Sequence, residues 1–246
     1  MKYSVIKKVK NHLEIQNMIS LPLWPEFMLH DPVAIKYWSK LFEYFPDYQF
    51  TLKSEKEYIG MANCIPIYWD KPLEELPEKG WDWVFKKGID DYENKRKPNI
   101  LNGLQIAVNK EHQKKGISSI ILKEMVNLAK EKGFEKVIIP VRPSLKSLYP
   151  LIFIDSYINW KREDNLPYDP WLRVHIRFGG KIIKVCHEAM YISGTIKEWE
   201  KWTGLRFFES GEYIVKGGLN PVKIDLNNDI GEYVEPNIWV LHEVNN

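Results

Sequence analysis

The sequence lacks the features of disulfide-rich, metal-clustered and membrane proteins. It contains only 2 cysteines in 246 residues, and Cys64 and Cys186 lie far apart in the chain. This spacing excludes a zinc site built from cysteine thiolates and argues against a disulfide framework, so both are expected to be buried thiols. No apolar run approaches the roughly 18 residues needed to span a bilayer, and no signal-peptide core follows the N-terminal lysines. We expect a cytoplasmic protein with no membrane partner.

An excess of charge of one sign is also lacking. The chain has 35 Lys and Arg against 33 Asp and Glu, which leaves a formal net charge of +2. This balance does not suit a protein that neutralises the phosphates of a nucleic acid, so no nucleic-acid partner is expected. Aromatic residues, by contrast, are abundant, with 10 Trp and 13 Tyr. They indicate an aromatic-lined cavity or interface.

No repeat, low-complexity tract or flexible linker divides the chain, so residues 1–246 are expected to form a single domain. The apolar patterns predict both helices and strands in the N-terminal part. An aromatic segment, residues 21–31, separates the first two helices. The predicted elements are a strand over Val5–Val9, helices over 12–19 and 32–45, an antiparallel hairpin of strands over 48–53 and 58–67, and a helix within 70–98.

The middle of the chain has the pattern strand, tight turn, helix, parallel strand. Leu104–Val108 and Val137–Val141 are the strands, and the apolar spacing between them predicts a helix from about Gly116 to Gly133. Together with the preceding hairpin, this makes the fold class mixed α+β. Beyond it we expect an irregular segment over 142–170, helices over 171–178 and 196–203, a strand over 181–191, and a last strand near Tyr213 that closes the domain.

The turn before the middle helix is suited to an anion. Its core is Gln113-x-x-Gly116-x-Ser118, and the first-turn amides of the helix that follows have no intrahelical partners. These amides and the helix dipole favour negative charge, while Gly116 permits close approach of a ligand. Lys114 and Lys115 add positive charge. A diphosphate fits this place.

This turn, in a strand–helix–strand unit that follows an antiparallel hairpin, resembles the GCN5-related N-acetyltransferase (GNAT) superfamily. The motif of that superfamily is Gln or Arg, two residues, Gly, one residue, and Gly or Ala. Ser118 departs from the last position but is still small, and Val141-Arg-Pro-Ser144 matches the stretch typical of the next strand. The resemblance implies a central, mostly antiparallel sheet splayed between two parallel strands and flanked by helices. It also implies insertions near 70–100 and 145–167 and a C-terminal extension from about 195.

The family implies an acyl-CoA co-substrate, most often acetyl-CoA, and direct transfer to an amine of a small-molecule or peptide acceptor, with no metal. The pantetheine arm is then expected beside Leu104–Val108, where this strand splays from Val137–Val141. The residues expected to bind the cofactor are Val108, Gln113, Lys114, Lys115, Gly116, Ile117 and Ser118. One alternative is a non-catalytic acyl-CoA-binding or regulatory module. Another is transfer of a longer acyl group or transfer to a non-amine acceptor. A homodimer is compatible with the sequence.

The proton donor is expected on the helix over 171–178. Counting back four residues from Gly179 places His175 where the family has a Tyr, while the usual Asn is replaced by Tyr168. An imidazole exchanges protons near neutrality, although a packed structural histidine is the other interpretation. Tyr149 and Tyr168 are the fallback donors, and His112 is expected to face solvent.

The acceptor is expected near the aromatic segment. Glu26, His30 and Asp31 are candidates to meet an amine, although Asp31 before Pro32 is better explained as a helix cap. Several aromatic side chains are candidates to line the acceptor pocket or to form core: Trp24, Phe27, Trp69, Trp81 and Trp83.

Overall fold

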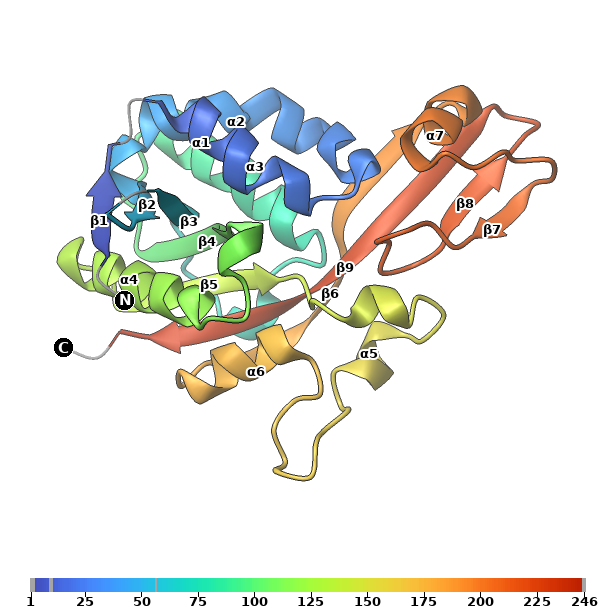
Figure 1. The fold of residues 1–246 in the computed structure, drawn as a ribbon. Helices are drawn as coiled ribbons and strands as arrows, with labels where there is room; N and C mark the ends of the chain where they lie inside the picture. The colour runs from blue at the N-terminus through green and yellow to red at the C-terminus, as the bar shows by residue number, and fades with distance from the viewer. Residues whose placement is uncertain (1–2, 9–10, 56, 245–246) are drawn as a thin grey trace.

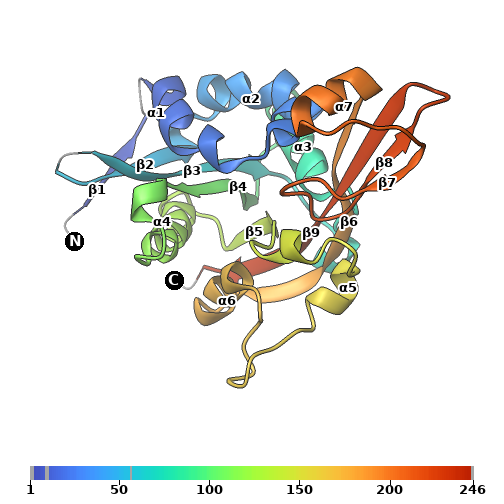
Figure 2. The same ribbon diagram turned by 45° about the vertical axis from the view of Figure 1, so that its right-hand side comes forward.

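The computed structural model describes residues 3–8, 11–55 and 57–244, which form one nine-stranded sheet with helices on both faces (Figures 1 and 2). The strand order is β1-β2-β3-β4-β5-β9-β8-β7, and β6 pairs with β9 outside this path. The strands are β1 (Ser4–Lys7), β2 (Gln49–Lys53), β3 (Tyr58–Ile67), β4 (Ile100–Val108), β5 (Lys136–Val141), β6 (Lys181–Gly194), β7 (Gly211–Tyr213), β8 (Val222–Asp225) and β9 (Ile230–Glu243).

The helices lie close to their predicted positions. Within the described ranges, none is long and apolar enough to cross a membrane. Local caps explain several boundaries: the Asp31 side chain accepts from the amide of Ala34 at 2.7 Å, and Thr195 and Glu198 form a capping box. The α-helices are α1 (His12–Ile19), α2 (Pro32–Tyr44), α3 (Gly80–Glu93), α4 (Ile117–Glu131), α5 (Ile154–Tyr157), α6 (Pro170–Arg177) and α7 (Ile196–Thr203).

The two faces of the sheet are covered by different helices. In Figure 1, α1, α2 and α3 lie on one side and α4 and α6 on the other. The first face buries Leu41, Phe85 and Trp239 in one apolar cluster, and the second buries Ile121 and Met125 in another. The helix-flanked, mostly antiparallel sheet expected from the sequence is therefore confirmed.

The first two-thirds of the chain differ from the sequence prediction only in detail. The predicted strand over Val5–Val9 is β1, which ends at Lys7, and Val9 lies outside the described residues. β4 begins at Ile100, four residues before the predicted start. The segment over 142–170, predicted to be irregular, contains the short helix α5. Cys64 and Cys186 are buried free thiols, as predicted.

The end of the chain was predicted wrongly. The strand near Tyr213 is the short edge strand β7, and it is followed by β8 and by β9, a 14-residue strand in the middle of the sheet. One edge of β9 pairs with β6 over most of its length. Its other edge pairs with β5 between Ile238 and Glu243, and with β8 between Ile230 and Glu232. The last strand thus joins the body of the sheet to β8 and to the C-terminal segment that is expected to form an extension.

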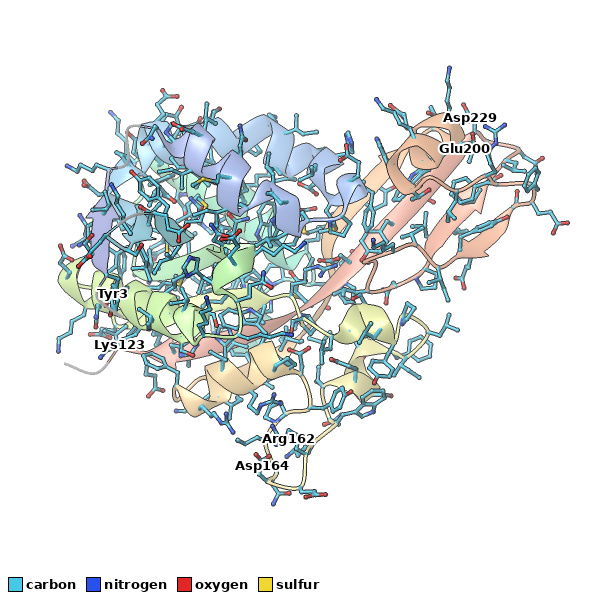
Figure 3. All side chains as sticks on the ribbon, in the orientation of Figure 1. Tyr3, Lys123, Arg162, Asp164, Glu200 and Asp229 are labelled. Atoms are coloured by element: carbon cyan, nitrogen blue, oxygen red, sulfur yellow. The ribbon has the colours of Figure 1, made fainter. Side chains whose placement is uncertain are left out.

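The segment over 145–167, which the sequence led us to expect as an insertion, is anchored at its base. Lys146 is fully buried, and its ammonium donates to the carbonyl oxygens of Tyr149 at 2.9 Å and Leu219 at 2.6 Å. The tip of the insertion, marked by Arg162 and Asp164 in Figure 3, projects away from the sheet. The Leu219 contact ties the insertion to the loop before β8.

The extension packs through Trp199 of α7, which is fully buried and donates its indole N–H to the carbonyl of Gly231 at 2.8 Å. A Cβ on Gly231 would lie 2.3 Å from the Trp199 ring, whereas one on Gly211 would meet no atom within 4 Å. We expect Gly231→Ala to lower the free energy of unfolding by about 1–3 kcal/mol because it overpacks this contact. Gly211→Ala should change it by less than about 0.5 kcal/mol. Urea unfolding measures both, and equal effects would contradict the packing argument.

Candidate active site

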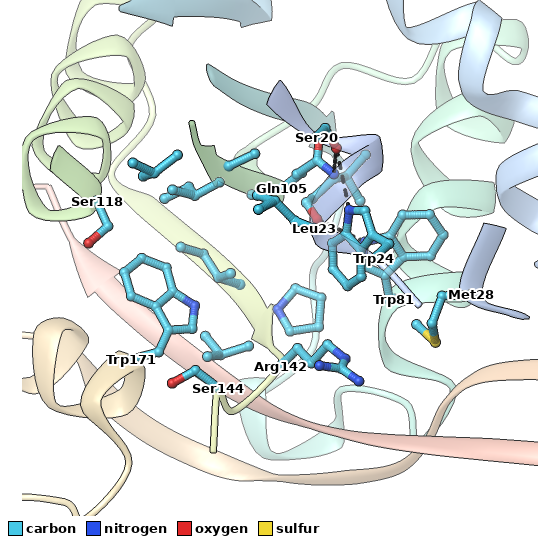
Figure 4. A pocket seen from close by; sticks show the side chains of 18 of the residues that line it. Ser20, Leu23, Trp24, Met28, Trp81, Gln105, Ser118, Arg142, Ser144 and Trp171 are labelled. Carbon is cyan, nitrogen blue, oxygen red and sulfur yellow. Dashed lines mark hydrogen bonds between the residues drawn. The ribbon is translucent and has the colours of Figure 1, made fainter. Parts of the chain in front are cut away.

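A cavity of about 870 Å³ opens where β4 and β5 separate (Figure 4). The parallel ladder between these strands consists of two residue pairs, Leu101 with Val137 and Asn102 with Ile138. Beyond these pairs the strands diverge, and residues 103–108 and 139–142 line the two sides of the cavity. The splay predicted between Leu104–Val108 and Val137–Val141 is confirmed.

The predicted anion-binding turn forms one end of this cavity. Gly116 occupies the N-cap position of α4 with φ +77°, and Lys114 also has a positive φ of 60°. The first backbone bonds of the helix run from the amides of Ser119 and Ile120 to Gly116 O, so the amides before them have no intrahelical acceptor. They form a local concentration of N–H donors at the positive end of the helix dipole.

Most of the residues expected to bind the cofactor lie on the cavity wall. Val108, Gln113, Lys114, Gly116, Ile117 and Ser118 line it, whereas Lys115 is exposed and does not. The expectation that His112 faces solvent is wrong. Its ring is buried against the cavity, with Nε2 2.8 Å from Glu57 Oε1, because the short 3-10 helix Lys110–His112 turns it inward.

The aromatic segment closes the opposite end of the cavity, but only in part as expected. Trp24 lines it and donates to Ser20 Oγ at 3.3 Å, and Gln105 donates to the same oxygen at 2.7 Å (Figure 4). Glu26 and Phe27 do not line it, since Glu26 is exposed and Phe27 packs in the core against Trp199 and Tyr233. Trp81, but neither Trp69 nor Trp83, is a lining residue.

A buried ion pair lies at this end. Arg142, directly after β5, donates from Nε to Glu235 Oε1 at 2.7 Å and from one terminal nitrogen to Gly217 O at 2.6 Å. The other oxygen of Glu235 accepts from the Tyr233 hydroxyl at 2.7 Å. Burial opposes the charge of Arg142, but the Glu235 carboxylate outweighs it and raises the pKa of Arg142 above its usual value. Arg142, Glu235 and Asn237 all line the cavity.

Two further carboxyl groups face each other behind this wall. Asp31 Oδ2 and Asp82 Oδ1 are buried and receive no hydrogen bond from donors in the described part of the chain, and the two groups lie within bonding reach of each other. Burial, followed by the negative charge of Asp31, raises the pKa of Asp82 to about 8, and burial raises the pKa of Asp31 to about 6. Both pKa values are raised, so the pair favours one shared proton over two separate negative charges.

The acid pair lies next to the cavity without lining it. The amide of Tyr191 donates to Asp82 Oδ2 at 3.1 Å, and Asp31 caps α2 as the sequence favoured. Their chain neighbours Trp81 and Met190 do line the cavity. The charge of Glu235 acts on both carboxyls.

The predicted proton donors do not lie on the cavity wall. His175 is fully buried, with Nδ1 2.8 Å from Nε2 of His242 on β9, and α6 presents Trp171 and Val174 to the cavity instead. Burial, and then the charge of His242, hold the pKa of His175 well below its usual value. The hydroxyls of Tyr149 and Tyr168 contact each other at 2.9 Å. This geometry favours the structural interpretation of His175.

Arg142, Glu235, Asn237 and Asp82 belong to the site or lie beside it without having been expected there from the sequence. Arg142 was noted only as part of Val141-Arg-Pro-Ser144, and Glu235 and Asn237 belong to the strand that was missed. Their signal in the sequence is the alternation of Tyr233, Glu235 and Asn237, which places three polar groups on one face of a strand.

A mostly antiparallel sheet that splays between two parallel strands, with a helix N-terminus at one end of the slot, defines a coenzyme A-dependent acyltransferase fold. The chain belongs to the acetyltransferase (GNAT) family, whose model matches residues 13–151. It is an acyl-CoA-dependent N-acetyltransferase, as the resemblance implied, and the family uses acetyl-CoA as co-substrate.

Relatives cover almost the whole chain. This chain is 32% identical over 250 aligned residues to arginine N-acetyltransferase avaD of Aspergillus versicolor. The alignment covers 90% of this chain and 86% of that protein. The loading GNATL domain of CurA from Lyngbya majuscula has a TM-score of 0.63 at 18% identity, covering 99% of this chain and 98% of that domain. A Drosophila melanogaster polyamine N-acetyltransferase has a TM-score of 0.50 at 10% identity, covering 98% and 100%.

The His175–His242 pair should make stability depend on pH. Burial lowers the pKa of His242 to about 4 and that of His175 well below its usual value, whereas an unfolded histidine titrates near 6.5. Between about pH 6.5 and 4 the unfolded chain binds more protons, so these histidines stabilise the fold above this window and cease to do so as the pH falls through it. Each histidine should lower the free energy of unfolding by about 1.4 kcal/mol per pH unit within this window.

The control is the double variant His175→Leu with His242→Leu. Asp31 and Asp82 titrate with the opposite sign in the same range, because their raised pKa values make the folded state bind more protons. The difference between wild type and double variant therefore isolates the histidines. Urea unfolding at pH 7.5 and 5 should show that the free energy of unfolding falls more in the wild type than in the double variant. An identical decrease in both proteins would refute the lowered pKa values of the two histidines.

Proposed function

We propose that this N-acetyltransferase transfers the acetyl group of acetyl-CoA to an amine of a small cationic amino acid, and that free arginine is the first acceptor to test. The observation that carries the proposal is the similarity to arginine N-acetyltransferase avaD over 90% of the chain. The buried acidic groups at one end of the cavity support it, because they suit a positively charged acceptor.

We propose that coenzyme A occupies the slot between β4 and β5. Its diphosphate would accept from the amides of residues 114–118, where the N-terminus of α4 favours negative charge. Its pantetheine arm would run along Leu104–Val108, whose groups facing β5 are not used by the parallel ladder beyond Asn102. The thioester then lies towards Arg142 and the aromatic end of the cavity.

The charges at the acceptor end match a monocation. Arg142 and Glu235 pair with each other, and the Asp31 and Asp82 carboxyls add acidic character beside the cavity, so this end favours an acceptor with net positive charge. Arginine at neutral pH carries a guanidinium, an ammonium and a carboxylate, and thus one net positive charge. Lysine and ornithine carry the same net charge, so the guanidinium has to be tested separately.

The test is free thiol release from acetyl-CoA with arginine, lysine, ornithine, agmatine and spermidine as acceptors, and mass spectrometry of each product. We expect the highest kcat/KM with arginine. Propionyl-CoA and hexanoyl-CoA in place of acetyl-CoA measure the acyl chain length that the slot accepts. Turnover of neutral amines in preference to every cationic amino acid would contradict the proposal.

Gly116→Val should weaken coenzyme A binding by about tenfold or more, because a branched side chain at a positive φ displaces the amides that the diphosphate needs. Gly133→Val is a matched control. Gly133 has φ +79° just after the other end of α4, and a Cβ there meets no atom within 4 Å, as at Gly116. Both variants carry the same backbone strain, but only the first should change the affinity measured by calorimetry. Equal affinities would refute the placement.

A further inference from the structure

We propose that Arg142 binds the carboxylate of the amino-acid acceptor and thereby places the α-amine at the thioester. This inference rests on the proposed function, since it names a recognition group for an amino-acid acceptor. It makes Arg142 a specificity-determining residue that distinguishes arginine from amines of similar charge and shape that lack a carboxylate.

The guanidinium of Arg142 has more N–H donors than its partners in the described structure use. Nε donates to Glu235 Oε1, one terminal nitrogen donates to Gly217 O, and the Tyr233 hydroxyl also interacts with the guanidinium, which leaves part of its five N–H donors for another acceptor. Glu235 does not form a two-point pair with Arg142, because its other oxygen accepts from the Tyr233 hydroxyl. About one fifth of the Arg142 side chain is exposed, and the residue lines the cavity. The remaining N–H groups suit a carboxylate.

The orientation of this guanidinium is fixed before an acceptor arrives. Glu235 and the Gly217 carbonyl hold its Nε edge, and its central carbon lies 5.7 Å from the centre of the Trp24 ring. Figure 4 shows the side chain extending towards Trp24, Trp81 and Met28 at the aromatic end of the cavity. A group preorganised in this way loses little conformational entropy on binding, which favours recognition.

The position of Arg142 along the slot brings the α-amine to the reacting group. β5 ends at Val141, so Arg142 follows directly after the strand that forms one side of the slot. The carboxylate and the α-amine of an amino acid share one carbon atom. An acceptor held by its carboxylate at Arg142 therefore presents its amine where the proposed pantetheine arm ends.

The first experiment compares three acceptors with the wild-type enzyme and acetyl-CoA. Arginine has the carboxylate, argininamide has a neutral amide in its place, and agmatine lacks the group. Because a charged hydrogen-bonded contact is lost, we expect KM for argininamide and agmatine to exceed that for arginine by about tenfold to a hundredfold. The KM for acetyl-CoA should stay the same.

The second experiment repeats the comparison with variants whose fold is checked by circular dichroism. Arg142→Lys keeps the charge but loses the planar fork, and it should lower kcat/KM for arginine far more than for agmatine. The double variant Arg142→Met with Glu235→Gln removes both charges, avoids an unpaired buried carboxylate, and should abolish the preference for arginine. Arg177→Lys is the control, since Arg177 is exposed on α6 and does not line the cavity.

Each outcome supports or overturns the proposed role of Arg142. If both Arg142 variants lose the preference for arginine and Arg177→Lys keeps it, the result supports Arg142 as the group that binds the carboxylate, which we call the anchor. Equal kcat/KM of the wild type for arginine, argininamide and agmatine overturns it while the proposed function stands. An equal loss for all three acceptors in Arg142→Lys assigns Arg142 a purely structural role. If no cationic acceptor is acetylated, the proposed function fails and the anchor fails with it.

Discussion

The separation of β4 from β5 after only two ladder pairs is the constraint on which the site depends. It leaves a slot in the middle of an otherwise continuous sheet, with the N-terminus of α4 at one end and Arg142 at the other. Gly103, the first residue beyond the ladder, permits the closed end to pack, because a Cβ there would lie 2.7 Å from Met125 Sδ and 3.0 Å from Ile139. The absence of a side chain at Gly103 thus allows Met125 of α4 and Ile139 of β5 to pack against β4 where the slot begins to open.

β5 pairs with β4 over only two residue pairs, and β9 supplies the hydrogen bonds at its other edge. The antiparallel ladder from Lys136 with Glu243 to Val141 with Ile238 satisfies the other edge of β5 along its whole length. Glu235 and Asn237 of the same strand line the cavity. β9 therefore stabilises the splayed arrangement and at the same time supplies polar groups to the site. A change in its register would disturb both.

Elements with local signals could be predicted from the sequence, and those defined by tertiary contacts could not. The α4 turn and the α2 cap follow from Gly116 and Asp31, whose chemistry is local. β9 was missed because Glu235, Pro236 and Asn237 interrupt its apolar pattern, and these polar residues are favourable only beside the cavity. Counting back from Gly179 predicts His175 as the proton donor. On α6, however, Trp171 lies towards the cavity, while His175 turns to His242.

The buried charges at the Arg142 end of the cavity are costly for folding alone. Placing Arg142 and Glu235 in the interior requires desolvation that their attraction only partly repays, and apolar residues of similar volume commonly stabilise a protein as well or better. Asp31 and Asp82 add two carboxyls that have to share a proton. A cation in the neighbouring cavity would offset part of this cost, because it replaces lost hydration with a fixed attraction. The cationic acceptor that we propose would therefore give this cluster a role that the stability of the fold does not.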